Sequence, residues 1–264
     1  MMDEPRLIVT ETAPGVIRVT LNRPDVHNAF DDVLIAELEN EFKRLDEDRA
    51  VRVVVLAANG KSFSAGADLN WMKRMATFER SENVADAVRL GVLMNRIATL
   101  SKPVVGLIQG AAFGGGVGLV ACCDIALASE RASFCLSEVK LGLIPAVISP
   151  YVVEAIGARQ ARRYFLTAER FGAKEARRLG LVHEVVPEGE LEAAGAAMVE
   201  TLLPNGPGAI ASAKDLIDAV AHRPINRALT EDTARRIADA RASTEGREGV
   251  IAFLEKRRPD WAEK

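Results

Sequence analysis

The sequence predicts an α/β fold in which helices cover a parallel sheet. Three short apolar runs, Val53–Ala57, Val104–Ile108 and Ile125–Ala128, are typical of parallel strands that are buried on both faces. Helical patterns separate these runs, and strands that alternate with helices favour right-handed crossover connections. Beyond Pro150 helical patterns dominate. We therefore expect an α/β core followed by a helical C-terminal portion.

Length and composition are ordinary for a globular protein. The chain has 264 residues, of which 48% are hydrophobic and 27% charged, and its formal net charge is −3. This balance does not favour nucleic acid or an anionic membrane surface as a partner. The first residues lack the pattern of a signal peptide, and no apolar run is long enough to span a membrane. We expect a soluble, cytoplasmic protein.

The first elements are a hairpin and an amphipathic helix. The runs Leu7–Val9 and Val16–Leu21, separated by Ala13–Gly15, predict two strands joined by a turn. Asp31 can cap the helix that follows. The apolar residues of this helix fall on one face and predict its buried side; they are Leu34, Ile35, Leu38, Phe42 and Leu45.

The middle of the chain predicts a small-residue loop, a helix and a glycine turn. The loop spans Ala58–Leu69, and the helix spans about Asn83–Leu100. Three consecutive glycines, Gly114–Gly116, then lead into a helix at about Gly115–Cys122. Such a turn lets another group approach the N–H groups of a helix start, and it can hold a phosphate or a developing oxyanion. Close packing of the helix on its strand is the alternative role for these glycines.

The rest of the chain carries helical patterns that are broken at four places. The breaks are Gly172, Gly180–Val186, Pro204–Pro207 and Pro224, and Glu184–Val186 within the second predicts one short strand.

Other site patterns are incomplete. A dinucleotide fingerprint would need glycine where Leu119 stands, and a P-loop that ends at Gly60–Ser62 would need glycine at Val55. The three histidines are scattered, and the spacing of the cysteines is not that of a zinc site. We expect buried thiols at Cys122, Cys123 and Cys135, and no metal site.

The loop Ala58–Leu69 and the glycine turn each leave a parallel strand. The carboxyl ends of such strands line one crevice, so the two loops can present two backbone N–H groups to a single oxygen. Taken in order, the motifs resemble the crotonase, or enoyl-CoA hydratase/isomerase, superfamily over nearly the whole chain. The motifs are Asn22–Pro24 with Asn28–Phe30, Phe63–Leu69, Ala111–Gly118, Cys123–Ala126, Ser137–Pro145 and Phe253–Pro259.

The resemblance implies both architecture and assembly. It implies a crotonase (ClpP-like) spiral β-β-α core over residues 1–200 and a helical C-terminal region over residues 201–264. This C-terminal region is expected to form homotrimers, often paired into hexamers.

The resemblance also implies a site for an acyl-CoA substrate. The N–H groups of Ala67 and Gly115 would hold the thioester oxygen and stabilise an enolate, and Glu138 would be the acid/base residue. No metal or separate cofactor is implied, because CoA arrives as part of the substrate. The other residues implied in binding are His27, Ala29, Ala65, Gly66, Asp68, Leu69, Gly114, Gly118 and Lys256, the last often acting in a neighbouring subunit. Solvated surface charge is the alternative role for Lys256.

One position departs from the family pattern. The hydratases use two carboxylates, and the second position is Gly118 here. Glycine would make room for a substrate that carries its own terminal carboxylate and would avoid repelling it. Glu138 would then act alone or with an ordered water. The segments Asp68–Met72, Cys122–Asp124 and Phe134–Tyr151 resemble bacterial methylglutaconyl-CoA hydratase-like proteins of leucine and acyclic-terpene degradation.

We therefore expect a hydratase that adds water across the double bond of a 2-enoyl-CoA. An enoyl-CoA isomerase and a non-catalytic CoA-binding paralogue are the alternatives.

Overall fold

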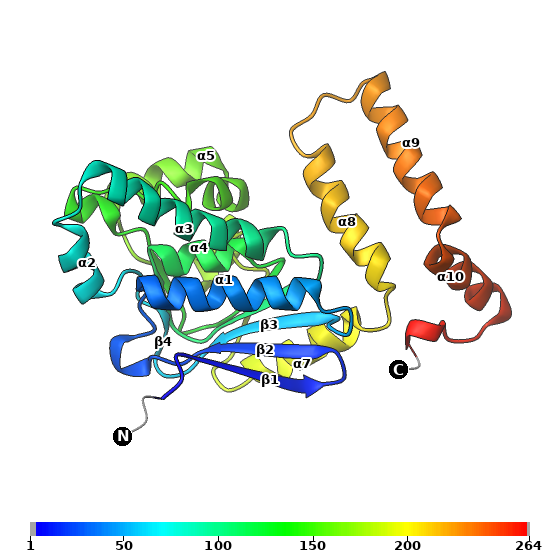
Figure 1. The fold of residues 1–264 in the computed structure, drawn as a ribbon, viewed down its shortest axis with the longest axis horizontal. Coiled ribbons are helices and arrows are strands. Elements are labelled where there is room, and N and C mark those ends of the chain that lie inside the picture. Colours follow the sequence, from blue (N-terminus) through cyan, green and yellow to red (C-terminus); the bar gives the residue numbers. More distant parts are fainter. Residues whose placement is uncertain (1–3, 263–264) are drawn as a thin grey trace.

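The computed structural model describes residues 4–262, and a six-stranded sheet forms its centre (Figure 1). The strand order is β1-β2-β3-β5-β7-β10, in which β1 is antiparallel to β2 and all other neighbours are parallel. The predicted α/β class is confirmed. The bounds are β1 Leu7–Ala13, β2 Val16–Leu21, β3 Val53–Ala58, β5 Val104–Ile108, β7 Ile125–Ser129 and β10 Glu184–Val186.

A second sheet has the order β4-β6-β8-β9 and consists of short strands. β4 (Ser62–Ser64), β6 (Ala111–Phe113) and β8 (Ser133–Cys135) follow β3, β5 and β7 in turn, and β9 (Phe171–Gly172) is antiparallel to β8. This alternation gives the spiral β-β-α core that the resemblance implies. The predicted loop Ala58–Leu69 is wrong in part, because it contains β4, and the strand β6 that precedes the glycine turn was not predicted.

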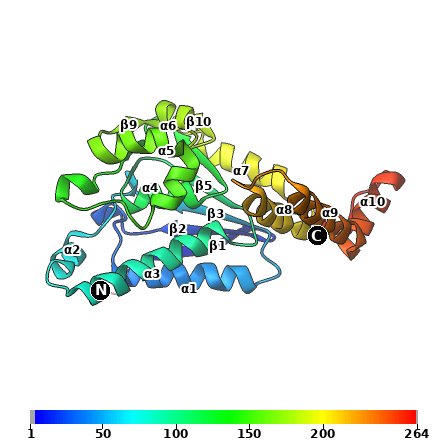
Figure 2. The same cartoon turned by 90° about the horizontal axis from the view of Figure 1, so that it is seen from above.

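Helices cover both faces of the six-stranded sheet (Figures 1 and 2). α1 (Asp32–Glu47) and α3 (Arg80–Ala98) cover one face, and α7 (Leu191–Leu202) packs on the other against Val105 and Leu107. Asp31 caps α1 by accepting a hydrogen bond from Leu34 N at 2.8 Å, and the five predicted residues of its apolar face are buried. The remaining core helices are α2 Leu69–Met75, α4 Gly115–Cys122, α5 Ser149–Thr167 and α6 Ala173–Leu179.

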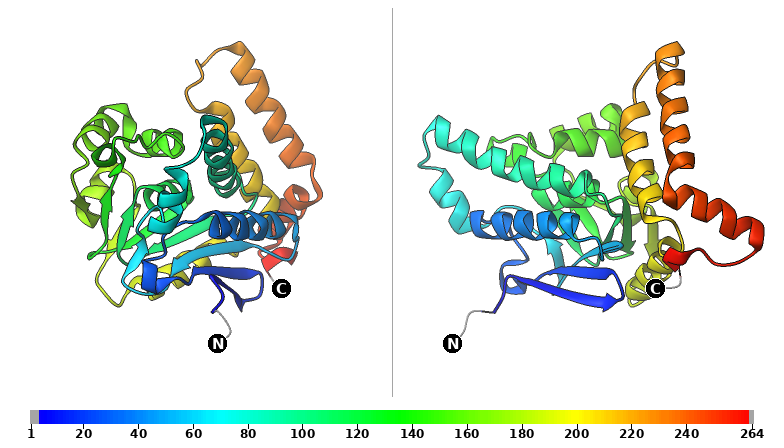
Figure 3. Two further views of the ribbon diagram at one scale, coloured as in Figure 1. Left: turned by 60° about the vertical axis from the view of Figure 1, so that its left-hand side comes forward. Right: turned by 45° about the vertical axis from the view of Figure 1, so that its right-hand side comes forward.

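Three C-terminal helices project from the core (Figures 1 and 3). They are α8 (Pro207–Val220), α9 (Arg227–Ala242) and α10 (Thr244–Glu255). One ion pair links α8 to the core: Lys214 Nζ lies 2.7 Å from Asp124 Oδ2. α7 belongs to the core as far as Leu202, so the expected boundary after residue 200 falls in its last turn.

Across residues 4–262, no helix is both long and apolar enough to cross a membrane. The three cysteines are free and buried, as predicted.

Candidate active site

Phe30 holds the loop that contains Ala67. Phe30 N donates to Gly66 O at 2.6 Å, and Asp68 N donates to Phe30 O at 2.7 Å. Phe30 and Ala67 thus form a parallel bridge, in which the residue between the two hydrogen bonds, Ala67, does not donate its own N–H to the partner strand. The N–H of Ala67 is therefore directed away from Phe30.

The Phe30 side chain supports the second loop. A Cβ placed on Gly115 would lie 3.1 Å from Cδ2 of the Phe30 ring, so the ring packs directly on this glycine. The two loops also touch each other: a Cβ placed on Gly66 would lie 3.0 Å from Phe113 O and 3.8 Å from Gly114 Cα. The structure thus brings together the two predicted loops, and Phe30, which the sequence did not single out, joins them.

Two backbone donors in these loops are open. Ala67 is exposed and Gly115 is half-buried, and within residues 4–262 neither N–H donates a hydrogen bond. Gly115 is the first residue of α4, where N–H groups have no partner inside the helix. A pair of such donors can stabilise an oxygen atom that gains negative charge.

Glu138 lies beside the glycine loops. It begins a 3-10 helix, Glu138–Leu141, and a Cβ placed on Gly114 would lie 3.2 Å from Glu138 Oε1. Its Oε2 is buried without a hydrogen-bond partner in the described part of the chain. Desolvation raises the pKa of the Glu138 carboxyl, only partly offset by a backbone hydrogen bond. A carboxyl in this state is suited to take up and release a proton.

The raised pKa of Glu138 predicts a pH-dependent stability. The folded chain binds the Glu138 proton more tightly than the unfolded chain does. The contribution of this proton to the free energy of unfolding is therefore lost as the pH rises from the unfolded pKa through the folded pKa. Glu138→Gln should therefore raise the melting temperature relative to wild type above this window, and should have little effect below pH 4. Thermal melts of both proteins from pH 4 to pH 9 test this. A constant difference across that range would contradict it.

Arg23 ties the Ala67 loop to the core and was missed as a functional residue. Its Nη1 donates to Ala29 O at 2.6 Å, and its Nη2 lies 3.0 Å from Asp68 Oδ2 and 3.2 Å from Asp31 Oδ2. Asp68 is buried, and its Oδ1 accepts hydrogen bonds from Asn70 N and Trp71 N at the start of α2. The Asp68 carboxylate is therefore occupied by protein donors, and the contact of Asp68 with CoA stays a prediction.

Arg23→Met should lower the free energy of unfolding by about 3 kcal/mol, because it leaves the buried Asp68 carboxylate without its cation, whereas Asp31 keeps Arg6 Nη1 at 2.5 Å. Urea denaturation measures this change. Arg131→Met is the matched control, since Arg131 and Glu188 form a pair whose side chains are 67% and 61% exposed. That variant should change the free energy of unfolding by less than about 1 kcal/mol. Equal losses in both variants would contradict the role given to Arg23.

The space beside Gly118 was expected to be open, but apolar side chains fill it. A Cβ placed on Gly118 would overlap Ile148 Cγ2, and it would lie 2.9 Å from Ile148 Cβ and 3.3 Å from Met94 Cε. Ile148 is 2% exposed. The prediction that Gly118 makes room for a substrate group or an ordered water is wrong, because apolar side chains already fill that room.

The other predicted residues divide into two groups. His27 and Leu69 are exposed, Ala65 is half-buried and Ala29 is buried. His27 and Ala29 lie in the segment of Phe30, and Ala65 and Leu69 lie in the loop that pairs with Phe30. Ala65 N donates to His27 O at 2.9 Å. Lys256 instead ends α10, on the far side of the molecule from α2 (Figures 1 and 2). Within one chain, the structure does not bring Lys256 to the other site residues.

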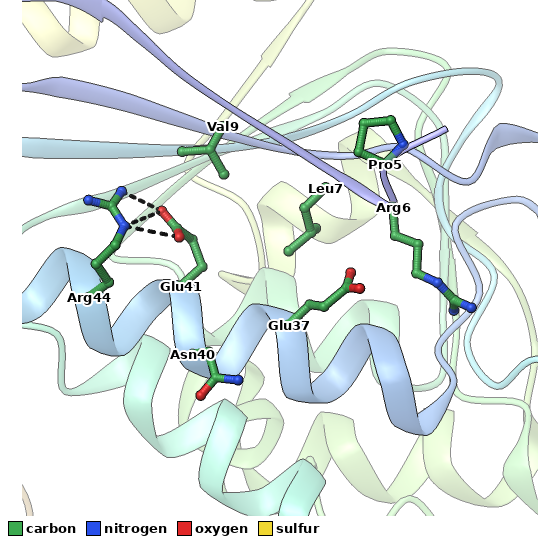
Figure 4. Close-up of a pocket in the computed structure, with 8 residues that line it drawn as sticks. All are labelled: Pro5, Arg6, Leu7, Val9, Glu37, Asn40, Glu41 and Arg44. Atoms are coloured by element: carbon green, nitrogen blue, oxygen red, sulfur yellow. Dashed lines mark hydrogen bonds and ion pairs between the residues drawn. The ribbon is translucent and has the colours of Figure 1, made fainter. Parts of the chain in front are cut away.

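A surface pocket between β1 and α1 is separate from this site (Figure 4). Arg44 on its wall pairs with Glu41 (Figure 4). Its lining residues are Pro5, Arg6, Leu7, Val9, Glu37, Asn40, Glu41 and Arg44, and none of the predicted site residues is among them.

The spiral of β-β-α units, in which the Gly66 and Gly114 loops touch beside Glu138, places the fold in the crotonase class of proteins. The comparisons agree: the enoyl-CoA hydratase/isomerase family description matches residues 11–264. The chain therefore belongs to the enoyl-CoA hydratase/isomerase family.

Individual relatives cover almost the full chain. A putative enoyl-CoA hydratase of Thermus thermophilus is 34% identical over 91% of this chain and 95% of its own length. The 2,3-dehydroadipyl-CoA hydratase of Escherichia coli is 31% identical over 96% of this chain and 98% of its own length. The crystal structure of an enoyl-CoA hydratase from Shewanella pealeana superimposes with a TM-score of 0.95 at 47% identity, covering 98% of this chain and 97% of that one.

Proposed function

We propose that this enzyme adds water across the double bond of a 2-enoyl-CoA. One observation carries the proposal: the open N–H groups of Ala67 and Gly115 lie in touching loops, and the carboxyl of Glu138, whose Oε2 has no hydrogen-bond partner in the described residues, lies beside them. Donors at this place suit the oxygen of a thioester, and a carboxyl there suits proton transfer at the neighbouring carbon.

In the proposed reaction Glu138 moves one proton twice. Glu138 takes a proton from water as the water oxygen bonds to C3 of the acyl group. The electron pair of the C2–C3 double bond then resides on the thioester oxygen as an enolate, which the N–H groups of Ala67 and Gly115 stabilise. The enolate collapses as Glu138 returns the proton to C2, which leaves a 3-hydroxyacyl-CoA.

The rim of the site suits the CoA part of the substrate. We place the adenine and pantetheine against the segments of His27, Ala29 and Ala65 and against Gly66 and Leu69, of which Leu69 is 74% exposed. Gly114 stays side-chain-free between Gly66 and Glu138. Lys256 can approach CoA phosphates only in another copy of the chain, because α10 lies away from the site of its own chain (Figure 1).

A homotrimer, or a hexamer of two trimers, is the proposed assembly. In support, α10 exposes large apolar side chains, including Phe253 at 81% and Leu254 at 72%. Apolar surface of this kind marks association sites. Light scattering after size-exclusion chromatography should give the mass of three or six chains, and replacing both Phe253 and Leu254 by serine should lower it. A monomeric wild type would contradict this assembly.

The proposed acyl group is 3-methylglutaconyl, which ends in a second carboxylate. The branch-specific segments of the sequence support it, and the Escherichia coli relative is named for a dehydroadipyl substrate. A site that lacks a second carboxylate at position 118 does not repel such a group.

Double-bond isomerisation is the second candidate. The lone carboxyl favours it, because Gly118 has no side chain and Ile148 fills the adjacent space. An isomerase base needs only to remove a proton from one carbon and return it to another.

Mass spectrometry in heavy water separates the candidates. The purified protein is incubated with 3-methylglutaconyl-CoA and, separately, with an unbranched 2-enoyl-CoA. A product heavier by one water supports the hydratase and shows which acyl group fits. Deuterium incorporation and a moved double bond without added water would favour the isomerase. No change in either substrate, with CoA still bound, would favour the non-catalytic paralogue or another acyl group.

A further inference from the structure

Ile148 and Glu138 both lie against the start of α4, although neither residue belongs to that helix. Gly118 N donates to Gly114 O at 3.3 Å, so the two glycines lie one helical turn apart. The position of a Cβ on Gly114 faces Glu138 Oε1, and the position of a Cβ on Gly118 faces Ile148. Both glycines therefore belong to the first turn of α4 and its cap, so the isoleucine and the reactive carboxyl lie against the same end of this helix.

The backbone around Ile148 is well anchored. Ile148 precedes α5, and Val152 N donates to Ile148 O at 3.1 Å. Ser149 Oγ donates to Ala146 O at 2.7 Å, and Pro150 limits the backbone in the first turn. Because Ile148 is also 2% exposed, it has little freedom to yield to a side chain at position 118.

We propose that Ile148 is a specificity-determining residue. Its side chain fills the place that a second acid at position 118 would need, so Glu138 is the only carboxyl that takes part in the reaction. This inference rests on the proposed function. The second acid is then not merely absent from position 118, because Ile148 excludes any side chain there. Gly118 and Ile148 then form a matched pair, in which a change at one requires a change at the other.

A consequence concerns the balance between hydration and proton exchange. With Ile148 in place, only Glu138 can accept the proton of the attacking water. The same carboxyl can also remove a proton from C4 of the bound substrate and return it to C2 through a dienolate, which shifts the double bond and needs no water on C3. A second carboxyl at position 118 would hold the water and favour its addition.

The test compares wild type with Gly118→Glu, Ile148→Gly and the double variant. Glycine is chosen at position 148 because alanine would leave a Cβ 2.9 Å from the Cβ of residue 118. Glycine is also an acceptable residue at a helix N-cap. The two readouts are the melting temperature and, in heavy water, the ratio of 3-hydroxyacyl-CoA to enoyl-CoA that has gained deuterium at C2 by the double-bond shift without gaining water; this is called the hydration-to-exchange ratio.

Gly118→Glu alone should lower both the melting temperature and the turnover. The double variant should recover the melting temperature, and its hydration-to-exchange ratio should exceed that of Ile148→Gly by about tenfold or more. The matched control combines Gly118→Glu with Val152→Ala, which alters a buried residue one turn further along α5. This control should recover neither property.

Two results would overturn the inference. One is a Gly118→Glu variant that is as stable and active as wild type, and the other is a double variant whose ratio equals that of Ile148→Gly. Failure of the proposed function would look different: wild type would convert neither 2-enoyl-CoA, while positions 118 and 148 would still be coupled in melting temperature.

Discussion

Glu138→Gln is expected to lower kcat for hydration by about 10²- to 10⁴-fold, the contribution of a positioned acid/base group. Glutamine keeps the shape of the side chain, but its amide can neither accept nor return a proton. The KM for the acyl-CoA and the affinity for free CoA should stay close to the wild-type values, because the N–H groups of Ala67 and Gly115 are unaffected. Steady-state kinetics and isothermal titration calorimetry measure these quantities.

Glu130→Gln is the control for this change. Glu130 is exposed after β7 and lies outside the candidate site, so its replacement should leave kcat unaltered. A Glu138→Gln variant that keeps full turnover would assign the proton transfer to another group. A variant that loses CoA binding along with turnover would show that Glu138 maintains the shape of the site.

The rate of hydration should depend on pH through Glu138. Glu138 must be ionised to take a proton from water, and its pKa is raised by desolvation. The kcat/KM for hydration should therefore rise with pH through a limb that lies above the range of an ordinary glutamate. Glu138→Gln should remove this limb. A wild-type limb near pH 4 would contradict the burial that the structure shows.

Local pattern was sufficient for the long elements. The continuous apolar run of Val104–Ile108 predicts β5, and Asp31 followed by the apolar face of α1 predicts that helix, since each signal lies within one segment. The three-residue strands β4, β6 and β8 carry no such signal. Each exists only because it pairs with a segment distant in sequence, such as Ser62 with Ala111.

The site shows the same division between local and distant contacts. The motifs identify Ala67, Gly115 and Glu138, but the contacts that orient the loops join residues far apart in the chain. Arg23 and Asp68 are 45 positions apart. Ile148 lies in the segment Phe134–Tyr151, 30 positions from Gly118, and nothing in the sequence showed that its side chain packs against this glycine. The sequence therefore suggested an empty space where the structure has a packed one. A missing side chain in a sequence therefore does not establish a cavity.

Gly66→Ala should displace one of the two proposed oxyanion donors, the N–H of Ala67, and lower kcat by about 10²- to 10³-fold. Gly66 has a φ of +87°, which alanine rarely adopts, and its added Cβ would lie 3.0 Å from Phe113 O. Relief of this contact moves the Ala67 loop away from the β6–α4 turn. Because the N–H of Ala67 is useful only when it shares an oxygen with the N–H of Gly115, kcat should fall more than KM rises.

The cost of the backbone conformation must be separated from the effect on the site. Gly189 has a φ of +92°, and a Cβ placed there would have no neighbour within 4 Å. Gly189→Ala therefore carries the same conformational penalty, about 1–2 kcal/mol, without moving a loop. Both variants should lose stability in urea denaturation, Gly66→Ala the more because of its contact with Phe113 O, and only Gly66→Ala should lose turnover. If Gly189→Ala lost as much turnover, the effect would follow from stability alone, and the Ala67 N–H would have no special place in catalysis.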